Sequence, residues 1–332
     1  MGSESHDPAM NPEESPGSAP SARVSDTRSL QVDRQKVGAF LALAFGISWT
    51  SAAVIYLTEV DLGTLGGIAL VTLTFMWAPA IAAVVVQWRS SESIRTGCGL
   101  RLGRLRWVGI AWLTPVALIA AMIGIGVLLP DVTVTTDYSA YLLDLGLTQQ
   151  QADAAVAQLT ATPLPPVLLL VLQGLIAGLT INALAALGEE LGWRGLLLNE
   201  LSPLGFWKVS GITGVIWGIW HAPIILQGHN FPEAPVAGVV MMTGAMVAMA
   251  PVYTYLTVRA ESVLAATFFH GAFNGLGALS LVYLTGAGNL LIGPVGVVGI
   301  AAAFLLTLVC VAHDRFVAAN EITTGEPLSP WG

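Results

Sequence analysis

Long apolar runs alternate with short polar segments along most of this chain. A helix needs about 20 predominantly apolar residues to cross a bilayer, and eight segments reach that length or come close to it. They are Val37–Leu57, Gly63–Gln87, Trp107–Leu129, Val167–Leu187, Val209–Leu226, Ala234–Val258, Val263–Leu284 and Leu290–Val311. The fifth is the shortest, and charges interrupt the continuation of the fourth toward Leu201. The pattern predicts an all-α polytopic membrane protein with about eight transmembrane helices.

Composition supports this class and excludes others. Of the 332 residues, 55% are hydrophobic and only 10% are charged, whereas soluble domains carry roughly 25% charged residues. The net charge of −8 gives no electrostatic basis for binding nucleic acid. The two cysteines, Cys98 and Cys310, predict neither a disulfide framework nor a cysteine metal site.

The basic residues predict an orientation in the cell membrane. When eight helices are threaded through a bilayer, all 13 Lys and Arg residues except Arg194 fall on one side of it. The loops on the other side, 58–62, 130–166, 227–233 and 285–289, contain no Lys or Arg. By the positive-inside rule, both termini of this multi-pass protein are expected in the cytoplasm.

These patterns divide the chain into five parts. Residues 1–36, rich in Ser, Pro, Asp and Glu, are expected to form a disordered cytoplasmic tail rather than a cleaved signal peptide. Residues 37–129 should hold three transmembrane helices. Residues 130–166 should form an extracytoplasmic loop that shows no sign of chemistry and whose stretch Tyr138–Leu159 is expected along the membrane surface. A five-helix membrane core over 167–311 and a cytoplasmic C-terminal tail over 312–332 complete the chain.

Glycine pairs one helical turn apart allow helices to approach closely. Gly214–Gly218 and Gly271–Gly275 have this spacing, although 36 glycines would produce some such pairs by chance. They indicate helix contacts within the core.

Ionisable residues inside membrane spans are costly and are candidates for function. Here they occur in three motifs: Glu189-Glu190-x-x-x-Arg194, Trp217-x-x-x-His221 and His270-x-x-x-Asn274. Counted from the predicted cytoplasmic helix ends, Glu189, His221 and His270 lie roughly 16, 18 and 12 Å deep. One shared, water-reachable cavity on the cytoplasmic half would accommodate all three.

The spacing within the motifs predicts how their side chains interact. Glu190 and Arg194 share a helix face and are expected to pair. Glu189 points about 100° away and is left for chemistry. The indole of Trp217, one turn from His221, is expected to enclose or orient that histidine.

In this order, the three motifs resemble those of the CAAX protease and bacteriocin-processing (CPBP) family of intramembrane endopeptidases, which is related to the type II CAAX prenyl endopeptidase. The resemblance covers about residues 165–280. Trp217 stands where the family usually has Phe, which keeps an aromatic residue at that position.

The resemblance implies hydrolysis of peptide bonds in membrane-bound peptides or proteins. It gives Glu189 the role of general base and His221 that of holding the attacking water. His270 and Asn274 are implied to stabilise the oxyanion. The residues expected to support these groups structurally are Glu190, Arg194 and Trp217.

Several alternatives stay open on the sequence alone. Glu189, His221 and His270 would also suffice as ligands of a catalytic zinc ion, although the chain lacks a His-Glu-x-x-His motif. We favour the metal-free reaction, which needs no cofactor. A transporter is disfavoured because the ionisable groups cluster at one depth. A non-catalytic scaffold or immunity-type protein with the same fold is the remaining alternative.

Overall fold

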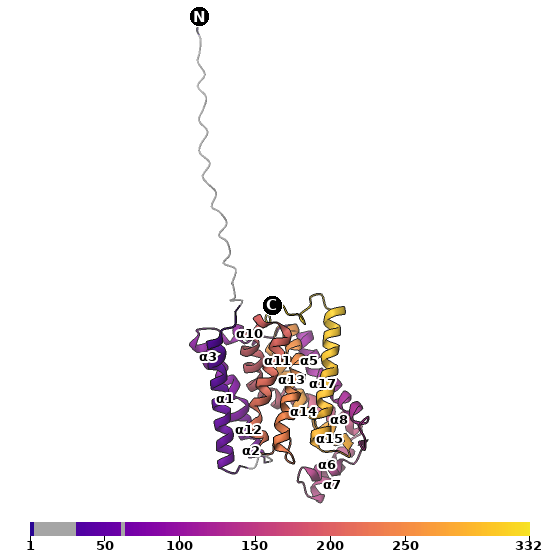
Figure 1. The fold of residues 1–332 in the computed structure, drawn as a ribbon. Coiled ribbons are helices and arrows are strands. Elements are labelled where there is room, and N and C mark those ends of the chain that lie inside the picture. The colour runs from indigo at the N-terminus through magenta and orange to yellow at the C-terminus, as the bar shows by residue number, and fades with distance from the viewer. Residues whose placement is uncertain (3–30, 61–63) are drawn as a thin grey trace. The chain divides into compact units, whose positions relative to one another are not determined.

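The apolar runs form a bundle of helices in a computed structural model that describes residues 1–2, 31–60 and 64–332 (Figure 1). Most of the predicted tail, residues 1–36, lies outside the described residues. The first helix begins at Arg34, where the Asp33 side chain accepts a hydrogen bond from the backbone N–H of Lys36 at 2.9 Å. Such a cap satisfies one of the amide groups that a helix start leaves unpaired.

The first three predicted spans are helical throughout most of their length. The elements are α1 (Arg34–Leu57), α2 (Leu65–Leu70), the π-helix η1 (Val71–Met76), α3 (Ala78–Arg89), α4 (Ile94–Gly97) and α5 (Leu105–Gly126). The second predicted span thus consists of three elements. Pro115 lies inside α5, as membrane helices tolerate.

The segment predicted as an extracytoplasmic loop contains short elements. They are β1 (Thr133–Val134), α6 (Tyr138–Asp144) and α7 (Gln149–Thr160). β1 pairs antiparallel with β2 (Leu284–Thr285), so that Thr133 lies opposite Thr285. This two-stranded ladder attaches the segment to the end of the bundle.

The remaining chain supplies the other helices. They are α8 (Pro166–Leu179), α9 (Ile181–Glu190), the π-helix η2 (Leu191–Leu197), α10 (Leu198–Leu201), the 3₁₀-helix η3 (Ser202–Leu204), α11 (Phe206–Trp220), α12 (Ala222–Ile225), α13 (Pro235–Ala260), α14 (Val263–Leu276), α15 (Leu279–Tyr283), α16 (Asn289–Ile292) and α17 (Val297–Phe316). The last residues of the chain fold back onto the bundle, where the backbone N–H of Leu328 donates to the carbonyl of Ser202 at 2.9 Å.

The all-α polytopic class is confirmed. Within the described residues, six helices are long and apolar enough to cross a membrane, or seven if α8 and the segment Ile181–Leu204, bent by 51°, form one span. The predicted span Val209–Leu226 falls short of this criterion. Its helix α11 has 15 residues, about 22 Å, and the chain turns at His221 into the short α12.

Both predicted glycine pairs lie at close helix contacts. Gly214 and Gly218 of α11 face α13, and Gly271 and Gly275 of α14 face α8. A Cβ atom at Gly271 would stand 2.6 Å from the carbonyl oxygen of Gly178, closer than any side chain permits. Because α8 leads into the first motif and α14 carries the third, this contact fixes the two motifs relative to each other.

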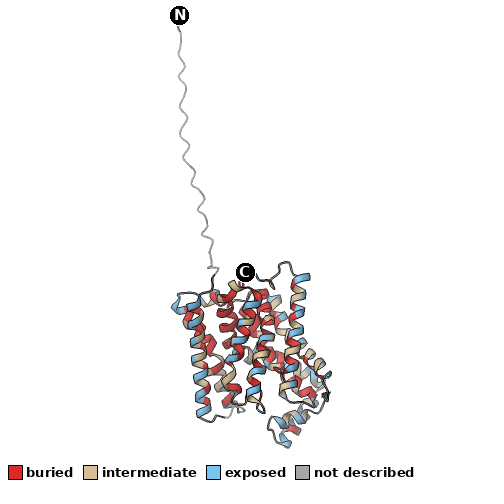
Figure 2. Ribbon diagram, in the orientation of Figure 1, coloured by how far each residue is buried: buried red, intermediate tan, exposed pale blue. Residues whose placement is uncertain are grey.

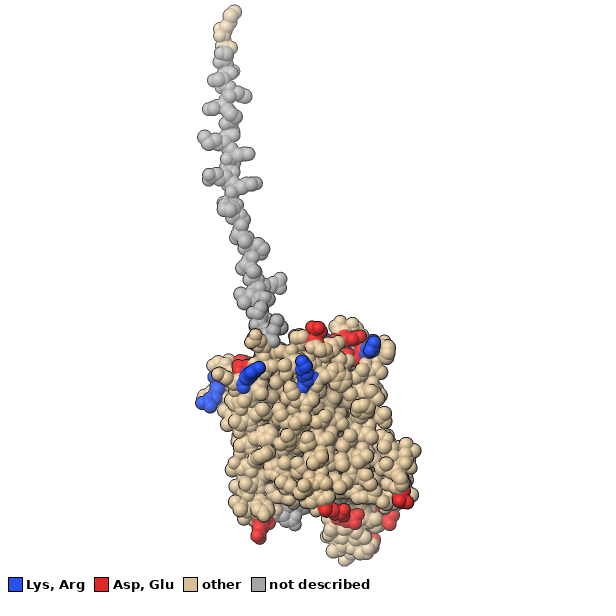
Figure 3. Space-filling view, viewed as in Figure 1, with Lys and Arg blue, Asp and Glu red and all other residues tan. Residues whose placement is uncertain are grey.

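The bundle has a buried centre and two chemically different ends. Buried residues line the inward helix faces and exposed residues the outward faces (Figure 2), many of them large and apolar, as lipid contact requires. On the face seen in Figure 3, Lys and Arg gather at the end where α10 and the C-terminus lie. We call this the basic end. The opposite end, with α6, α7 and α12, shows only acidic charges on the same face (Figure 3). We call it the acidic end.

Candidate active site

The first motif is buried at the junction of α9 and η2. Glu189 and Glu190 end α9, and Arg194 follows in the π-helical turn; their exposed fractions are 2%, 0% and 1%. The Arg194 Nη1 atom donates to both carboxylate oxygens of Glu190, at 3.2 and 3.1 Å. The pairing predicted from the i,i+4 spacing is therefore present.

Two aromatic rings enclose the Arg194 guanidinium. Its central carbon lies 4.0 Å from the ring centroid of Trp217 and 4.0 Å from that of Tyr253. Such cation–π contacts are strongest where water is excluded. Trp217 was expected near this site. Tyr253, on α13, was missed, because a lone tyrosine in an apolar helix gives no polar pattern to notice.

Trp217 connects the first two motifs through two hydrogen bonds. Its indole Nε1 donates to Oε2 of Glu189 at 2.7 Å, and its backbone carbonyl lies 2.7 Å from Nδ1 of His221. The histidine is thus oriented by the backbone of Trp217 as well as by its ring. The bond to Glu189 was not predicted, and a phenylalanine at this position could not donate it.

Glu190 connects the first motif to the third. His270, 5% exposed on α14, lies with Nδ1 2.7 Å from Oε1 of Glu190. One carboxylate therefore holds both Arg194 and His270. No pattern in the sequence indicated this contact, because the two residues are 80 positions apart.

The predicted catalytic residues face one space. Glu189, His221, His270 and Asn274 all line a cavity of about 520 Å³, together with Trp217. We call it the catalytic cavity, after the residues for which the resemblance implies a catalytic role. Methionines of α13 and aromatic side chains form much of the rest of its wall: Met242, Met246, Met249, Phe75, Trp220 and Phe273.

The catalytic cavity continues toward the acidic end, whereas the sequence led us to expect it on the half next to the basic residues. Residues of the acidic end, such as Asn230 and Asn289, take part in its lining. Toward the basic end, large buried side chains of η2 close the bundle: Trp193, Leu196 and Leu197 are 0% exposed. Depth counted along single helices does not reveal how such side chains fill one half of a bundle.

The donor set for a metal ion is not assembled in the described part of the chain. No three His, Cys, Asp or Glu side chains there are placed to hold one ion. Glu189 and both histidines are each engaged by another protein group through one atom. The three side chains expected as zinc ligands are not gathered around one ion position in this structure, and no reaction step is assigned to a metal.

Fold and site together define a polytopic α-helical membrane protein with carboxylate and imidazole groups around an internal cavity. Residues 166–276, from the start of α8 to the end of α14, match the family model described as type II CAAX prenyl endopeptidase Rce1-like. The predicted resemblance to the CAAX protease family is confirmed over this region, which contains all three motifs.

A curated relative supports the same family. Over 49 residues the chain is 41% identical to CAAX prenyl protease 2 of Methanococcus maripaludis. This alignment covers 14% of the present chain and 18% of that protein. The aligned stretch is thus a small part of both proteins.

Proposed function

We propose that this protein is an intramembrane endopeptidase of the CAAX type that hydrolyses membrane-associated peptides or proteins. One observation carries the proposal: the four residues named from the motifs line a single cavity within the bundle. All four residues lie in the region, 166–276, that matches the family model of type II CAAX prenyl endopeptidases.

In the proposed reaction, Glu189 is the general base and His221 helps to hold the attacking water. The hydrogen bond from Trp217 engages Oε2 of Glu189, so Oε1 is the atom assigned to the proton of the water. His221 Nδ1 faces a carbonyl oxygen, which only accepts, so the hydrogen of the neutral ring resides on Nδ1. The lone pair on Nε2 is then available to the same water.

His270 and Asn274 are proposed to stabilise the oxyanion. Nδ1 of His270 faces the Glu190 carboxylate and therefore carries a hydrogen. In the imidazolium form Nε2 also carries one and can donate it to the oxyanion. The Asn274 amide, one helical turn away, would supply a second donor.

The test is cleavage of a membrane peptide library by the purified full-length protein. Glu189→Gln keeps an acceptor for Trp217 but removes basicity, so the variant should fold and lose cleavage. Asn274→Ala should lower kcat roughly 10²–10³-fold, and His221→Ala should be as damaging as Glu189→Gln. Glu321→Gln, the same change at an exposed position outside the cavity, is the matched control. Undiminished cleavage by Glu189→Gln would refute the assignment.

The same variants separate the alternatives. A zinc-dependent enzyme should contain stoichiometric zinc that is lost in both His221→Ala and His270→Ala and kept in Asn274→Ala. A non-catalytic scaffold should retain its biological effect in Glu189→Gln. For the metal-free protease we expect that cleavage continues in the presence of a chelator. We also expect that the biological effect is lost in Glu189→Gln.

A further inference from the structure

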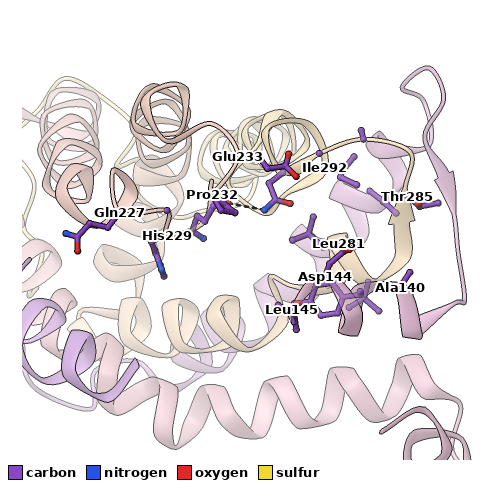
Figure 4. A pocket seen from close by; sticks show the side chains of 18 of the residues that line it. Ala140, Asp144, Leu145, Gln227, His229, Pro232, Glu233, Leu281, Thr285 and Ile292 are labelled. Carbon is purple, nitrogen blue, oxygen red and sulfur yellow. Dashed lines mark hydrogen bonds between the residues drawn. The ribbon is translucent and has the colours of Figure 1, made fainter. Parts of the chain in front are cut away.

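A second and larger cavity lies at the acidic end. It has a volume of about 1080 Å³ and is lined by the end of α1, the segment 135–145, the loop 227–233 and residues 281–292 (Figure 4). We call it the vestibule. The β1–β2 ladder and the contact between the rings of Tyr138 and Tyr283, 5.8 Å apart, hold the segment with α6 against the bundle and thereby keep the wall in place.

The vestibule and the catalytic cavity share part of their walls. Five residues line both: Tyr141, His229, Asn230, Leu281 and Asn289. At this junction the Asn289 side chain donates to the backbone carbonyl of Asn230 at 3.1 Å. The buried Oδ1 of Asn230 has no partner among the described residues. A polypeptide that reaches Glu189 through the vestibule passes this acceptor.

The charges of the vestibule have one sign. Four carboxylates line it, those of Glu59, Asp137, Asp144 and Glu233, and no Lys or Arg does. None of the four takes part in an ion pair within the part of the chain that the structure describes. A cleft lined by one sign of charge concentrates ligands of the opposite sign.

We propose that the vestibule is the substrate entrance of the catalytic cavity and that it binds a Lys- or Arg-bearing segment of a peptide chain. This inference rests on the proposed peptidase function. The positive-inside rule places the acidic end outside the cytoplasm, so the substrate segment is presented from the extracytoplasmic side. The apolar wall of the catalytic cavity then receives the neighbouring, membrane-embedded part of the same chain.

Binding can be tested separately from cleavage. Fluorescent hexalysine, hexaglutamate and hexaserine peptides are titrated into full-length Glu189→Gln protein in detergent at low ionic strength, and Kd is read from anisotropy. Hexalysine should bind most tightly, with an affinity that falls as salt rises. The double variant Asp144→Asn/Glu233→Gln should weaken it about tenfold, as expected for two partly exposed charge pairs.

The control is Asp153→Asn, a carboxylate of the same end that lies on α7 outside the vestibule. It should leave Kd unchanged. Equal Kd values for hexalysine and hexaserine would overturn the inference, as would equal weakening by Asp153→Asn. Because the measurement uses an inactive variant, it fails or succeeds independently of the peptidase assignment.

The side of entry is tested by labelling. Cys98 and Cys310 are 0% and 8% exposed, and burial raises the pKa of the Cys98 thiol to about 12, so the native cysteines should react slowly. A membrane-impermeant maleimide on intact cells should modify Asp144→Cys, and Arg95→Cys only after permeabilisation. A bulky maleimide on Asp144→Cys should block cleavage, and the same label on Asp153→Cys should not. If residue 95 and not residue 144 were labelled in intact cells, the assignment of substrate entry to the extracytoplasmic side would be wrong. If the label at residue 144 left cleavage unaffected, the vestibule would not be the substrate entrance.

Discussion

Arg194 with Glu190 and Arg259 with Asp314 are two buried arginine–carboxylate pairs, the first beside the catalytic cavity and the second at the basic end. Each carboxylate is 0% exposed. Each guanidinium also lies over an aromatic ring, Trp217 in the first pair and Tyr255 in the second. The two pairs differ in what completes their hydrogen bonds.

The Asp314 pair is completed by the chain itself. Besides Arg259, Asp314 accepts from the backbone N–H groups of Ile322 and Thr323 at 2.9 and 2.8 Å and from the Thr323 hydroxyl. Arg259 also donates to the carbonyl of Asn320. These bonds tie the C-terminal segment to the bundle.

The Glu190 pair is completed only in part. Glu190 takes His270 as its second partner, and Nη2 of Arg194 has no acceptor within the described residues. Burying a charge pair costs desolvation energy that good geometry must offset. At the basic end this cost is offset by bonds that anchor the chain, and at the cavity by bonds that orient a histidine.

Arg194→Ala should have the largest effect of the changes that test this comparison. It leaves the Glu190 carboxylate buried without its arginine, which should cost about 3–5 kcal/mol of stability. Yield and cleavage should both fall, while Arg194→Lys, which lacks the planar group that fits between two rings, should be tolerated only in part. Thermal unfolding in detergent measures this, and a fully active Arg194→Ala protein with normal yield would contradict it.

Arg259→Ala should be less damaging. Asp314 keeps its bonds to residues 322 and 323, so we expect a loss of about 1–3 kcal/mol. Specific activity per folded molecule should be unchanged, because this pair lies away from the catalytic cavity. If folded Arg259→Ala protein lost as much specific activity as Arg194→Ala protein, the functional distinction between the two pairs would be wrong.

The smallest expected effect comes from the stacked rings. Trp217→Phe keeps a ring over Arg194 but removes the hydrogen bond to Glu189, which should lower kcat about tenfold with little loss of stability. Tyr255→Phe is the matched change over Arg259 and should leave kcat as it is. The kcat values of Trp217→Phe and Tyr255→Phe are measured under the same conditions. Similar values for the two variants would contradict a positioning role of Trp217.

Much of the fold and the local geometry of the site could be predicted from the sequence. Apolar runs gave the polytopic helical class, and the i,i+4 rule gave the Glu190–Arg194 pair, because both depend on distances within one helix. The contact at Gly271 was likewise indicated by spacing. The three motifs also identified which side chains would gather around one cavity.

What the sequence did not reveal depends on how separate helices face one another. The bond between Glu190 and His270, the indole bond of Trp217 to Glu189 and the place of Tyr253 over Arg194 are all contacts between helices. No periodicity within a single helix encodes the rotation that brings them together. The segment 130–166 showed no chemistry for the same reason, since Asp137 and Asp144 line the vestibule only after the segment folds against the bundle.

The close contact of α8 and α14 at Gly178 and Gly271 has a consequence for how the protein tolerates mutation. Every replacement of a glycine adds at least a Cβ atom, and here that atom would meet the neighbouring backbone. The helix that leads to Glu189 and the helix that carries His270 would then move apart. In a survey of random variants these two glycines should therefore be as intolerant of change as a catalytic residue, although neither takes part in the chemistry.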